Sequence, residues 1–283
     1  IPENTQIWLF WILFIAFAIK MPLFPFHTWQ PPTYKMASTQ GAMILAGVMT
    51  KMGIYGALRF IFPVVPQGAL YWQNVIIILG ITGIIYASVI AFRHTNLKTM
   101  IAYSSMAHIS LMAAALFAMN EYATQGLLFQ VMAHGLTISA LFYLACLVKE
   151  KTGSTEFHQL GGLKSKAPNM AVLFLIAVLG SIALPLTAGF VGEFLMIAGL
   201  FKLSFWYAFA GGLTMILGAI YMLYAYQRVM LGGTKTVFEK ITDLNHMDYY
   251  ILVPLLLLII VLGVYPQPVF EILKMAGSAG LKW

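Results

Sequence analysis

Residues 16–29 read AFAIKMPLFPFHTW and place one lysine and two prolines inside what otherwise has the composition of a membrane-crossing helix. Lys20 interrupts the apolar run, and Pro22 and Pro25 each remove a backbone donor just after it. In hydrocarbon a lysine and a broken hydrogen-bond ladder are both costly, so such a segment persists only where protein or a water-filled cavity surrounds it. The stretch therefore indicates part of an ion path.

The composition is that of an integral membrane protein. Hydrophobic residues make up 61% of the 283 positions, charged residues make up 9%, and the mean hydropathy is +0.86. Soluble domains are nearer about half apolar and about a quarter charged. We interpret the formal charge of +7 as lysines and arginines at membrane edges rather than as a nucleic-acid surface. The single Cys146 excludes a disulfide within the chain.

Apolar runs of about 20 residues, the length that a helix needs to cross a bilayer, predict an all-α polytopic membrane bundle. We predict eight spans, at about 6–29, 39–62, 74–93, 98–118, 125–148, 168–200, 206–228 and 250–270. Ser38 and Asn96 are typical helix-starting residues before two of these spans, and Pro168 is compatible with a first helical turn.

Basic residues gather in alternate loops. Ten lie in or beside the first, third, fifth and seventh loops: Lys35, Arg93, Lys98, Lys149, Lys151, Lys164, Lys166, Arg228, Lys235 and Lys240. Four others lie on the opposite side: Arg59, Lys202, Lys274 and Lys282. Because basic loops stay in the cytoplasm, this bias predicts that both ends of the chain lie outside it, on the periplasmic side of a bacterial inner membrane.

The sixth span repeats the anomaly of the first. Residues 181–200 read SIALPLTAGFVGEFLMIAGL, where Pro185 and Gly189 interrupt the apolar run and Glu193 comes after them. Two interrupted helices, each with one buried charge, are typical of a transporter built from an internal repeat, since its sites lie where broken helices leave backbone groups free.

Five ionisable residues fall well inside the predicted spans: Lys20, Lys51, His108, His134 and Glu193. A charge inside a membrane span is a functional candidate by default. For the lysines, the alternative is a side chain that extends to the interface. For the glutamate, it is a structural partnership with a nearby basic residue.

The two histidines lie on polar stripes. Ser104 and Ser105 precede His108 by about one turn, and Gln130 precedes His134 by four residues on the same helix face. Either histidine alone could be a core residue bonded to a carbonyl, but two on adjacent helices suit a proton relay. A metal site is the competing hypothesis, but no Cys or carboxylate ligand has the required spacing.

The residue types support proton transfer without a covalent step. The sequence has no GxGxxG or GxxxxGK[ST] pattern and no CxxC motif. Lys98 is either a topology signal or a gate toward the cytoplasm. We interpret His27, Thr28 and Trp29 as an interface anchor.

Several stretches together resemble one family: AFAIKMPLFPFHTW, LAGVMTKMGIYGALRF, LKTMIAYSSMAHIS, MAHGLTISALF, LPLTAGFVGEF and LGVYPQP. In this order they resemble the subunit M family of bacterial NADH-quinone oxidoreductase (respiratory complex I), whose mitochondrial counterpart is NADH dehydrogenase subunit 4. The resemblance covers essentially the whole chain. The related subunits L and N differ after the first lysine, and subunit L has lysine where this chain has Glu193.

The resemblance implies an architecture of fourteen transmembrane helices with an inverted repeat and two broken helices. Residues 1–62 would be the end of the first antiporter-like half, residues 63–232 the second half, and residues 233–283 a loop and the final transmembrane helix. The family's first six helices, with the glutamate that pairs with the first lysine, have no counterpart here. We therefore expect the chain to be the C-terminal portion of a longer subunit.

The resemblance also implies residue roles. Lys20 and Lys51 would be the two buried lysines of the first half-channel. His108 and His134 would lie on the hydrophilic axis, and Glu193 would end the second half-channel. The loop WQPPTYKMASTQ, residues 29–40, departs from the family's WLPDAH-type sequence and lacks its Asp and His.

The implied function is proton translocation coupled to quinone reduction, by a subunit of the enzyme complex that itself transfers no electrons. NADH, FMN, iron-sulfur clusters and quinone are expected in other subunits, with no cofactor or metal in this chain. The expected partners are the lipid bilayer and other complex I membrane subunits, especially neighbouring antiporter-like ones.

Three alternatives remain. A subunit of a cation/proton antiporter complex or of a membrane-bound hydrogenase would share the two lysines and the broken helices. A structural membrane spacer would use the polar residues only to hold its helices together. An independent small-solute carrier would have to fold and transport without partner subunits.

Overall fold

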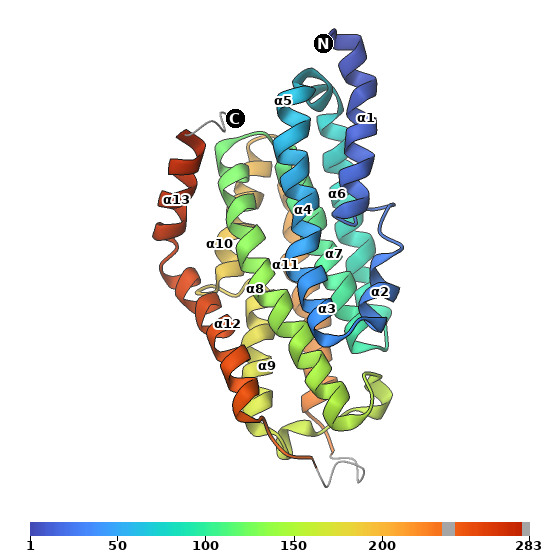
Figure 1. The fold of residues 1–283 in the computed structure, drawn as a ribbon, viewed down its shortest axis with the longest axis vertical. Helices are drawn as coiled ribbons and strands as arrows, with labels where there is room; N and C mark the ends of the chain where they lie inside the picture. The colour runs from blue at the N-terminus through green and yellow to red at the C-terminus, as the bar shows by residue number, and fades with distance from the viewer. Residues whose placement is uncertain (234–240, 279–283) are drawn as a thin grey trace.

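The computed structural model describes residues 1–233 and 241–278, which form a bundle of helices (Figure 1). Within them, six helical segments are long and apolar enough to cross a membrane. These are the run from α3 to α5 (Thr39–Val64), α6 (Pro66–Arg93), α7 (Leu97–Leu116), α8 (Glu121–Thr152), α11 (Phe205–Met230) and α12 (His246–Val264). Three further helices are α1 (Glu3–Lys20), α9 (Pro168–Ser181) and α10 (Ala188–Phe201). The predicted all-α membrane class is confirmed, and each of the eight predicted spans has a helical counterpart.

The first predicted helix break is confirmed. α1 ends at Lys20, irregular turns occupy residues 21–29, and α2 (Gln30–Met36) comes next. The turns contain Pro22 and Pro25, and the peptide bond preceding Pro25 is cis. The first span is therefore shorter than predicted, because its last nine residues are not part of the helix.

The second predicted break is also confirmed, with one correction. α9 ends at Ser181 and α10 begins at Ala188, with Pro185 between them. Gly189 is not in the break but in the first turn of α10. A Cβ atom on Gly189 would lie 2.7 Å from the carbonyl oxygen of Gly180, so the glycine allows α10 to start close against the end of α9.

The second span contains two turns of π-helix, Leu45–Met49 and Ala57–Ile61. They flank α4 (Thr50–Gly56), which carries Lys51. Short π-helical turns inside longer helices often occur at functional sites. The backbone therefore departs from regular α-helix on both sides of the segment that carries Lys51.

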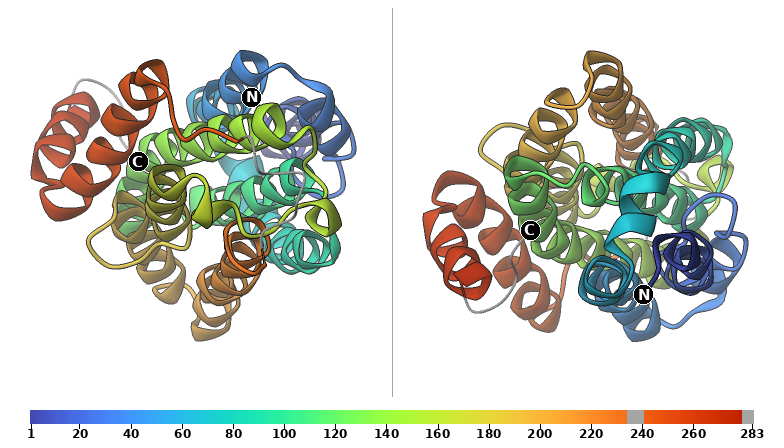
Figure 2. Two further views of the ribbon diagram at one scale, coloured as in Figure 1. Left: turned by 90° about the horizontal axis from the view of Figure 1, so that it is seen from below. Right: turned by 90° about the horizontal axis from the view of Figure 1, so that it is seen from above.

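Burial distinguishes the helices. Of the 18-residue window that best fits a membrane span, 94% is buried in α7 but only 22% in α12. α12 and the helix after it lie at one edge of the bundle (Figure 2). α7 is therefore the most deeply buried of the six segments, and protein surrounds the polar side chains that it carries.

The last predicted span, 250–270, is wrong at its C-terminal end. α12 ends before Pro266, and a separate helix, α13 (Gln267–Ser278), comes after it. Proline is common just beyond a helix end because it cannot continue the hydrogen-bond ladder. The ring of Phe270 in α13 stacks on Phe129 of α8 with centroids 5.2 Å apart, which holds α13 against the bundle.

The N-terminus and α13 lie toward one end of the bundle, and the loop after α8 lies at the other (Figure 1). The Nζ atom of Lys35 is 3.7 Å from the carboxylate of Glu156, which lies just beyond α8. The Nζ atom of Lys151 donates to the carbonyls of Thr242 and Asp243, each at 3.1 Å. We call this end, with Lys149, Lys151, Lys164 and Lys166, the basic end. Lys235 and Lys240 of the predicted topology signal lie outside the described residues.

Candidate functional site

Most of the polar residues singled out from the sequence are buried. They are Lys51, Lys98, Ser104, Ser105, His108, Gln130, His134 and Glu193, each at most 6% exposed. Burying polar groups is costly unless they are hydrogen-bonded or paired. Their partners therefore show what the arrangement can do.

His108 and Glu193 form the tightest pair. Nδ1 of His108 on α7 lies 2.8 Å from Oε1 of Glu193 on α10, and the two side chains are 3% and 1% exposed. Gln130 on α8 donates from Nε2 to the same carboxylate oxygen at 3.1 Å. Three helices thus converge on one buried carboxylate.

Glycine packing brings α8 and α10 together at this point. A Cβ atom on Gly192 would lie 2.4 Å from Oε1 of Gln130, and one on Gly126 would lie 2.6 Å from the backbone nitrogen of Met196. Only glycine leaves room for such an approach. Gln130 therefore hydrogen-bonds to Glu193, whereas the sequence pattern associated it with His134 on the same helix face.

His134 lies next to His108. The ring centroids are 5.4 Å apart and the rings are tilted by 46°. No ring nitrogen of either histidine has a hydrogen-bond partner among the described residues, so the 2.8 Å approach of His108 to Glu193 is a close contact without hydrogen-bond geometry. The two imidazoles can therefore still exchange protons with each other or with bound water.

Lys51 lies on a helical segment that packs against α8. Its Nζ atom donates to the carbonyl of Ala46, which also accepts from Oγ1 of Thr50 at 3.2 Å. A Cβ atom on Gly135 would lie 3.1 Å from the carbonyl oxygen of Gly47. Since Gly47 is about one turn before Lys51, and Gly135 is the residue after His134, the two titratable groups come from helix segments in direct contact.

The serines have different surroundings. Oγ of Ser104 accepts from the hydroxyl of Tyr221 on α11 at 3.2 Å. Oγ of Ser105 has no hydrogen-bond partner among the described residues. No sequence pattern singles out Tyr221, because it lies in a tyrosine-rich helix where several positions look equivalent.

Lys20 differs from the expectation of a buried lysine, because it is exposed on the surface of this chain. It lines a shallow apolar groove with Ile19, Trp29, Leu45 and Met49. The structure therefore does not bring it together with the buried group of Lys51, His134, His108 and Glu193.

Lys98 lies in the first turn of α7 and is 3% exposed. Its Nζ atom donates to the carbonyl of Ala37 at 3.4 Å. It borders a pocket of about 370 Å³ at the basic end, whose lining also contains Lys149 and Glu150. A lysine that served only as a topology signal would not need this burial.

Sequence reasoning missed a second buried polar group around the first break. Its members are His27, Gln30, Tyr34 and Thr50, each at most 3% exposed. His27 is thus buried rather than an interface anchor. The available signal was the spacing of Gln30 and Tyr34, which places them on one face of a short helix.

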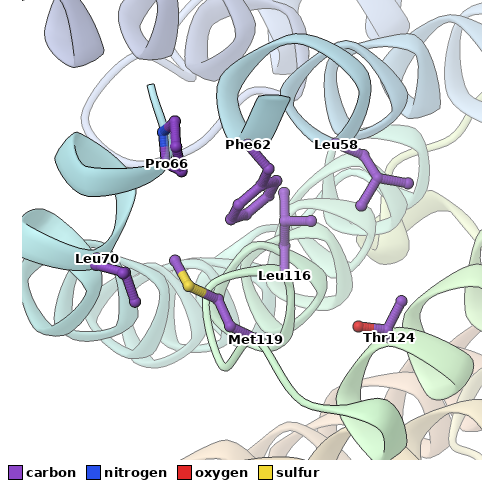
Figure 3. Close-up of a pocket in the computed structure, with 7 residues that line it drawn as sticks. All are labelled: Leu58, Phe62, Pro66, Leu70, Leu116, Met119 and Thr124. Carbon is purple, nitrogen blue, oxygen red and sulfur yellow. The ribbon is translucent and has the colours of Figure 1, made fainter. Parts of the chain in front are cut away.

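A separate apolar pocket of about 220 Å³ lies between α5, α6, α7 and α8 (Figure 3). Its lining residues are Leu58, Phe62, Pro66, Leu70, Leu116, Met119 and Thr124. None of these side chains is charged or titratable in the physiological pH range, so the pocket has no group that would accept or release a proton. Among the described residues, no cluster of three His, Cys, Asp or Glu side chains could hold a metal ion.

A family profile described as NADH:quinone oxidoreductase/Mrp antiporter, TM matches residues 1–218. The chain belongs to this family. A member from Rickettsia prowazekii (strain Madrid E), NADH-quinone oxidoreductase subunit M, is 40% identical over 277 residues, 98% of this chain and 56% of that protein. NADH-ubiquinone oxidoreductase chain 4 of Arabidopsis thaliana is 38% identical over 266 residues, 94% of this chain and 54% of that protein. The chain spans about half the length of the curated relatives that it matches.

Solved structures of respiratory complex I and of an Mrp complex contain chains with the same fold as this one. A chain of respiratory complex I from Thermus thermophilus with bound NADH has a TM-score of 0.88 at 31% identity, covering 94% of this chain and 56% of that chain. A chain of the Mrp complex from Dietzia sp. DQ12-45-1b has a TM-score of 0.84 at 18% identity, covering 93% and 57%. The latter shows a shared fold. The resemblance noted from the sequence motifs is confirmed.

Proposed function

We propose that this chain is part of a proton-translocating membrane subunit of an NADH-quinone oxidoreductase, and that protons pass along its buried titratable groups, Lys51, His134, His108 and Glu193. The observation that carries the proposal is the 2.8 Å contact between His108 and Glu193 inside the bundle. The names of the relatives at about 40% identity support the assignment to this enzyme class.

The relay needs no covalent chemistry. A neutral imidazole accepts a proton on one nitrogen and releases another from its second nitrogen. His134 would receive a proton from the side of Lys51 and pass one to His108. The Glu193 carboxylate would be the next acceptor, while Gln130 orients that carboxylate through its hydrogen bond.

Lys20 enters the proposal through the family resemblance. In this chain it is exposed, in an apolar groove that offers no counter-charge. The relatives are longer, and we propose that a carboxylate from their additional part covers Lys20. Lys20 would then be the first lysine of the relay, beside the π-helical turn Leu45–Met49 that comes just before Lys51.

The proposed role is non-redox. NADH, FMN, iron-sulfur clusters and quinone would be bound by other subunits, and quinone reduction there would change the electrostatics at the lysines. The chain would lie in a bacterial inner membrane beside other antiporter-like subunits, with the basic end toward the cytoplasm. Glu193 would exchange protons with the periplasmic side.

The test uses the complete complex in sealed membrane vesicles, with NADH-driven proton uptake and NADH-quinone activity measured together. Lys51→Ala and Glu193→Gln should each lower coupled proton uptake by roughly tenfold or more, because each removes a proton-transfer group. The matched controls are Lys166→Ala and Glu271→Gln, which neutralise exposed charges. Normal proton uptake in both relay variants, with assembly verified, would favour the structural spacer instead.

The family description also names Mrp antiporters, so an antiporter-like subunit of a cation/proton exchanger is the second candidate. The higher identity to oxidoreductase subunits argues against it, since the Mrp chain matches at 18%. Proton movement that requires sodium and persists without NADH would favour this second candidate.

A further inference from the structure

The pocket at the basic end includes Ala37, which comes three residues after Tyr34 of the second buried polar group. The pocket is lined by Ala37, Ser38, Thr39 and Lys98 on one side and by Cys146 and Lys149 of α8 on the other. It differs from the apolar pocket of Figure 3, because its walls carry charges and hydroxyls.

Tyr34 lies close to this opening but does not line it. It lies about one helical turn before Ala37 on α2, and its ring packs edge to face on Phe142 of α8 with centroids 5.2 Å apart. Phe142 is one turn deeper on α8 than Cys146, which lines the pocket. Tyr34 therefore lies one turn further into the bundle than the pocket, and it is 0% exposed.

Polar atoms continue from Tyr34 to Lys51. The side chains of Gln30 and Thr50 lie beside the Tyr34 hydroxyl. No described residue completes a hydrogen bond of good geometry with that hydroxyl or with either end of the Gln30 amide. Thr50 then shares the Ala46 carbonyl with Lys51.

Buried polar atoms without protein partners are rare in native proteins and are commonly satisfied by ordered water. Three such atoms occur here, between an open polar pocket and a buried lysine. A purely structural polar cluster would instead satisfy its own members. The arrangement fits a short water-bridged passage.

We propose that Tyr34, with Gln30 and Thr50 beside it, carries protons between the basic-end pocket and Lys51. The inference rests on the proposed function, in which Lys51 takes part in the relay. The Tyr34 hydroxyl accepts a hydrogen bond from a protonated water on one side and donates to the next acceptor on the other. One proton enters as another leaves, so the tyrosine is unchanged and no electron moves.

Lys98 is a positioning residue in this scheme. Its hydrogen bond to Ala37 holds the end of α2, and with it Tyr34, against α7.

The first experiment measures NADH-driven proton uptake by the assembled complex with Tyr34→Phe, which keeps the ring on Phe142 and removes only the hydroxyl. We expect coupled uptake to fall roughly tenfold. Tyr34→His should restore it, because an imidazole also accepts and donates protons. The matched control is Tyr143→Phe, which removes a hydroxyl that donates to Asp248 rather than facing the passage.

Unchanged uptake in Tyr34→Phe, together with loss in Lys51→Ala, would overturn this inference and leave the proposed function standing. Unchanged uptake in Lys51→Ala and Glu193→Gln would overturn the proposed function itself. Equal losses in Tyr34→Phe and Tyr34→His, with normal assembly, would show that the hydroxyl is needed for its hydrogen bonds and not for proton transfer, and they would also overturn the inference.

A second experiment does not depend on how well the Tyr34 variants assemble. Thr39→Cys in a Cys146→Ala background is labelled with a cationic, membrane-impermeant thiol reagent, applied to either face of the vesicles. We expect labelling from the basic-end side to cut proton uptake roughly tenfold relative to the same sample before labelling. Full labelling without a change in uptake would exclude the pocket as the entrance.

Discussion

The two broken helices end their hydrogen-bond ladders in the same manner. In the first, the amide of Leu23 donates to the carbonyl of Ala18 at 2.9 Å, and in the second, the amide of Leu184 donates to that of Leu179 at 3.1 Å. Each bond reaches five residues back instead of four. The same backbone hydrogen-bond pattern therefore ends both helices, although different side chains surround the two breaks.

The breaks differ in the helix that comes after each of them and in where their charge lies. The first break is long and leads into the short helix α2, whereas the second is short and leads directly into α10. Lys20, three residues before Leu23, is exposed, while Ser181, at the same position before Leu184, is 8% exposed. The charge of the second helix, Glu193, instead lies after the break and is enclosed.

This difference shows that a break alone does not make a site. Glu193 is enclosed because α7 and α8 supply His108 and Gln130 to meet it. Lys20 faces outward because the described residues supply no equivalent wall on that side. The charged residue after the second break, Glu193, meets its partners among the described residues. Near the first break, the buried polar side chains gather around α2 and not around Lys20.

A later helix covers each break with a glycine, and replacing these glycines should have the largest effect. A Cβ atom on Gly53 would lie 2.6 Å from the backbone nitrogen of Met21, and one on Gly263 would lie 2.4 Å from the carbonyl oxygen of Leu186. Backbone cannot move aside cheaply, so Gly53→Val and Gly263→Val should each destabilise the fold by about 3 kcal/mol. Thermal unfolding of the purified protein in detergent measures this loss.

The matched control is Gly212→Val, because a Cβ atom there would have no neighbour within 4 Å. It should change the melting temperature little. Equal melting temperatures for all three variants would mean that the breaks tolerate displacement. They would then not be fixed by the helices that cover them.

The N-terminus of α9 should give the next largest effect. Asp243 caps it from a distant loop, accepting from the amides of Asn169 at 2.8 Å and Met170 at 3.1 Å. α1 has no side-chain cap of this kind. Asp243→Ala should therefore destabilise the protein by about 1–2 kcal/mol, the usual cost of losing a capping side chain.

Asp243→Asn is the informative comparison, because an amide oxygen can still accept one of the two bonds. It should lose less stability than Asp243→Ala in the same thermal unfolding measurement. Identical losses for the two substitutions would show that the charge near the helix N-terminus, rather than the hydrogen bonds, supplies the stabilisation.

Much of this architecture can be predicted from sequence patterns, because bilayer thickness and proline chemistry act locally. Pro22 and Pro185 were enough to place both breaks. The partner of Glu193 was not predictable, since glycine contacts between α8 and α10 decide which side chain reaches it. The same holds for Tyr34, whose importance depends on a pocket formed by three distant segments. The division into two antiporter-like halves at residue 62 stays a prediction.

The smallest effect concerns the tether that holds α2 after the first break. The carboxylate of Glu156 accepts hydrogen bonds from Asn96 at 2.8 Å and Thr95 at 3.1 Å, and it lies 3.7 Å from Lys35 of α2. The bond from Asn96 is the largest cause that holds the pKa of Glu156 below its ordinary value of 4.5, and Thr95 and Lys35 act in the same direction.

Because the folded-state pKa is lower than the unfolded one, the tether stabilises the protein above about pH 4.5, and this contribution is lost as the pH falls through the folded-state pKa. The carboxylate is partly exposed, so the contribution should stay below about 1 kcal/mol. Glu156→Gln should flatten the fall of the melting temperature between about pH 6 and pH 4 relative to the unmodified protein. An unchanged slope would mean that α2 is held by the packing of Tyr34 alone. The first break would then resemble the second in relying on buried contacts rather than on a surface charge.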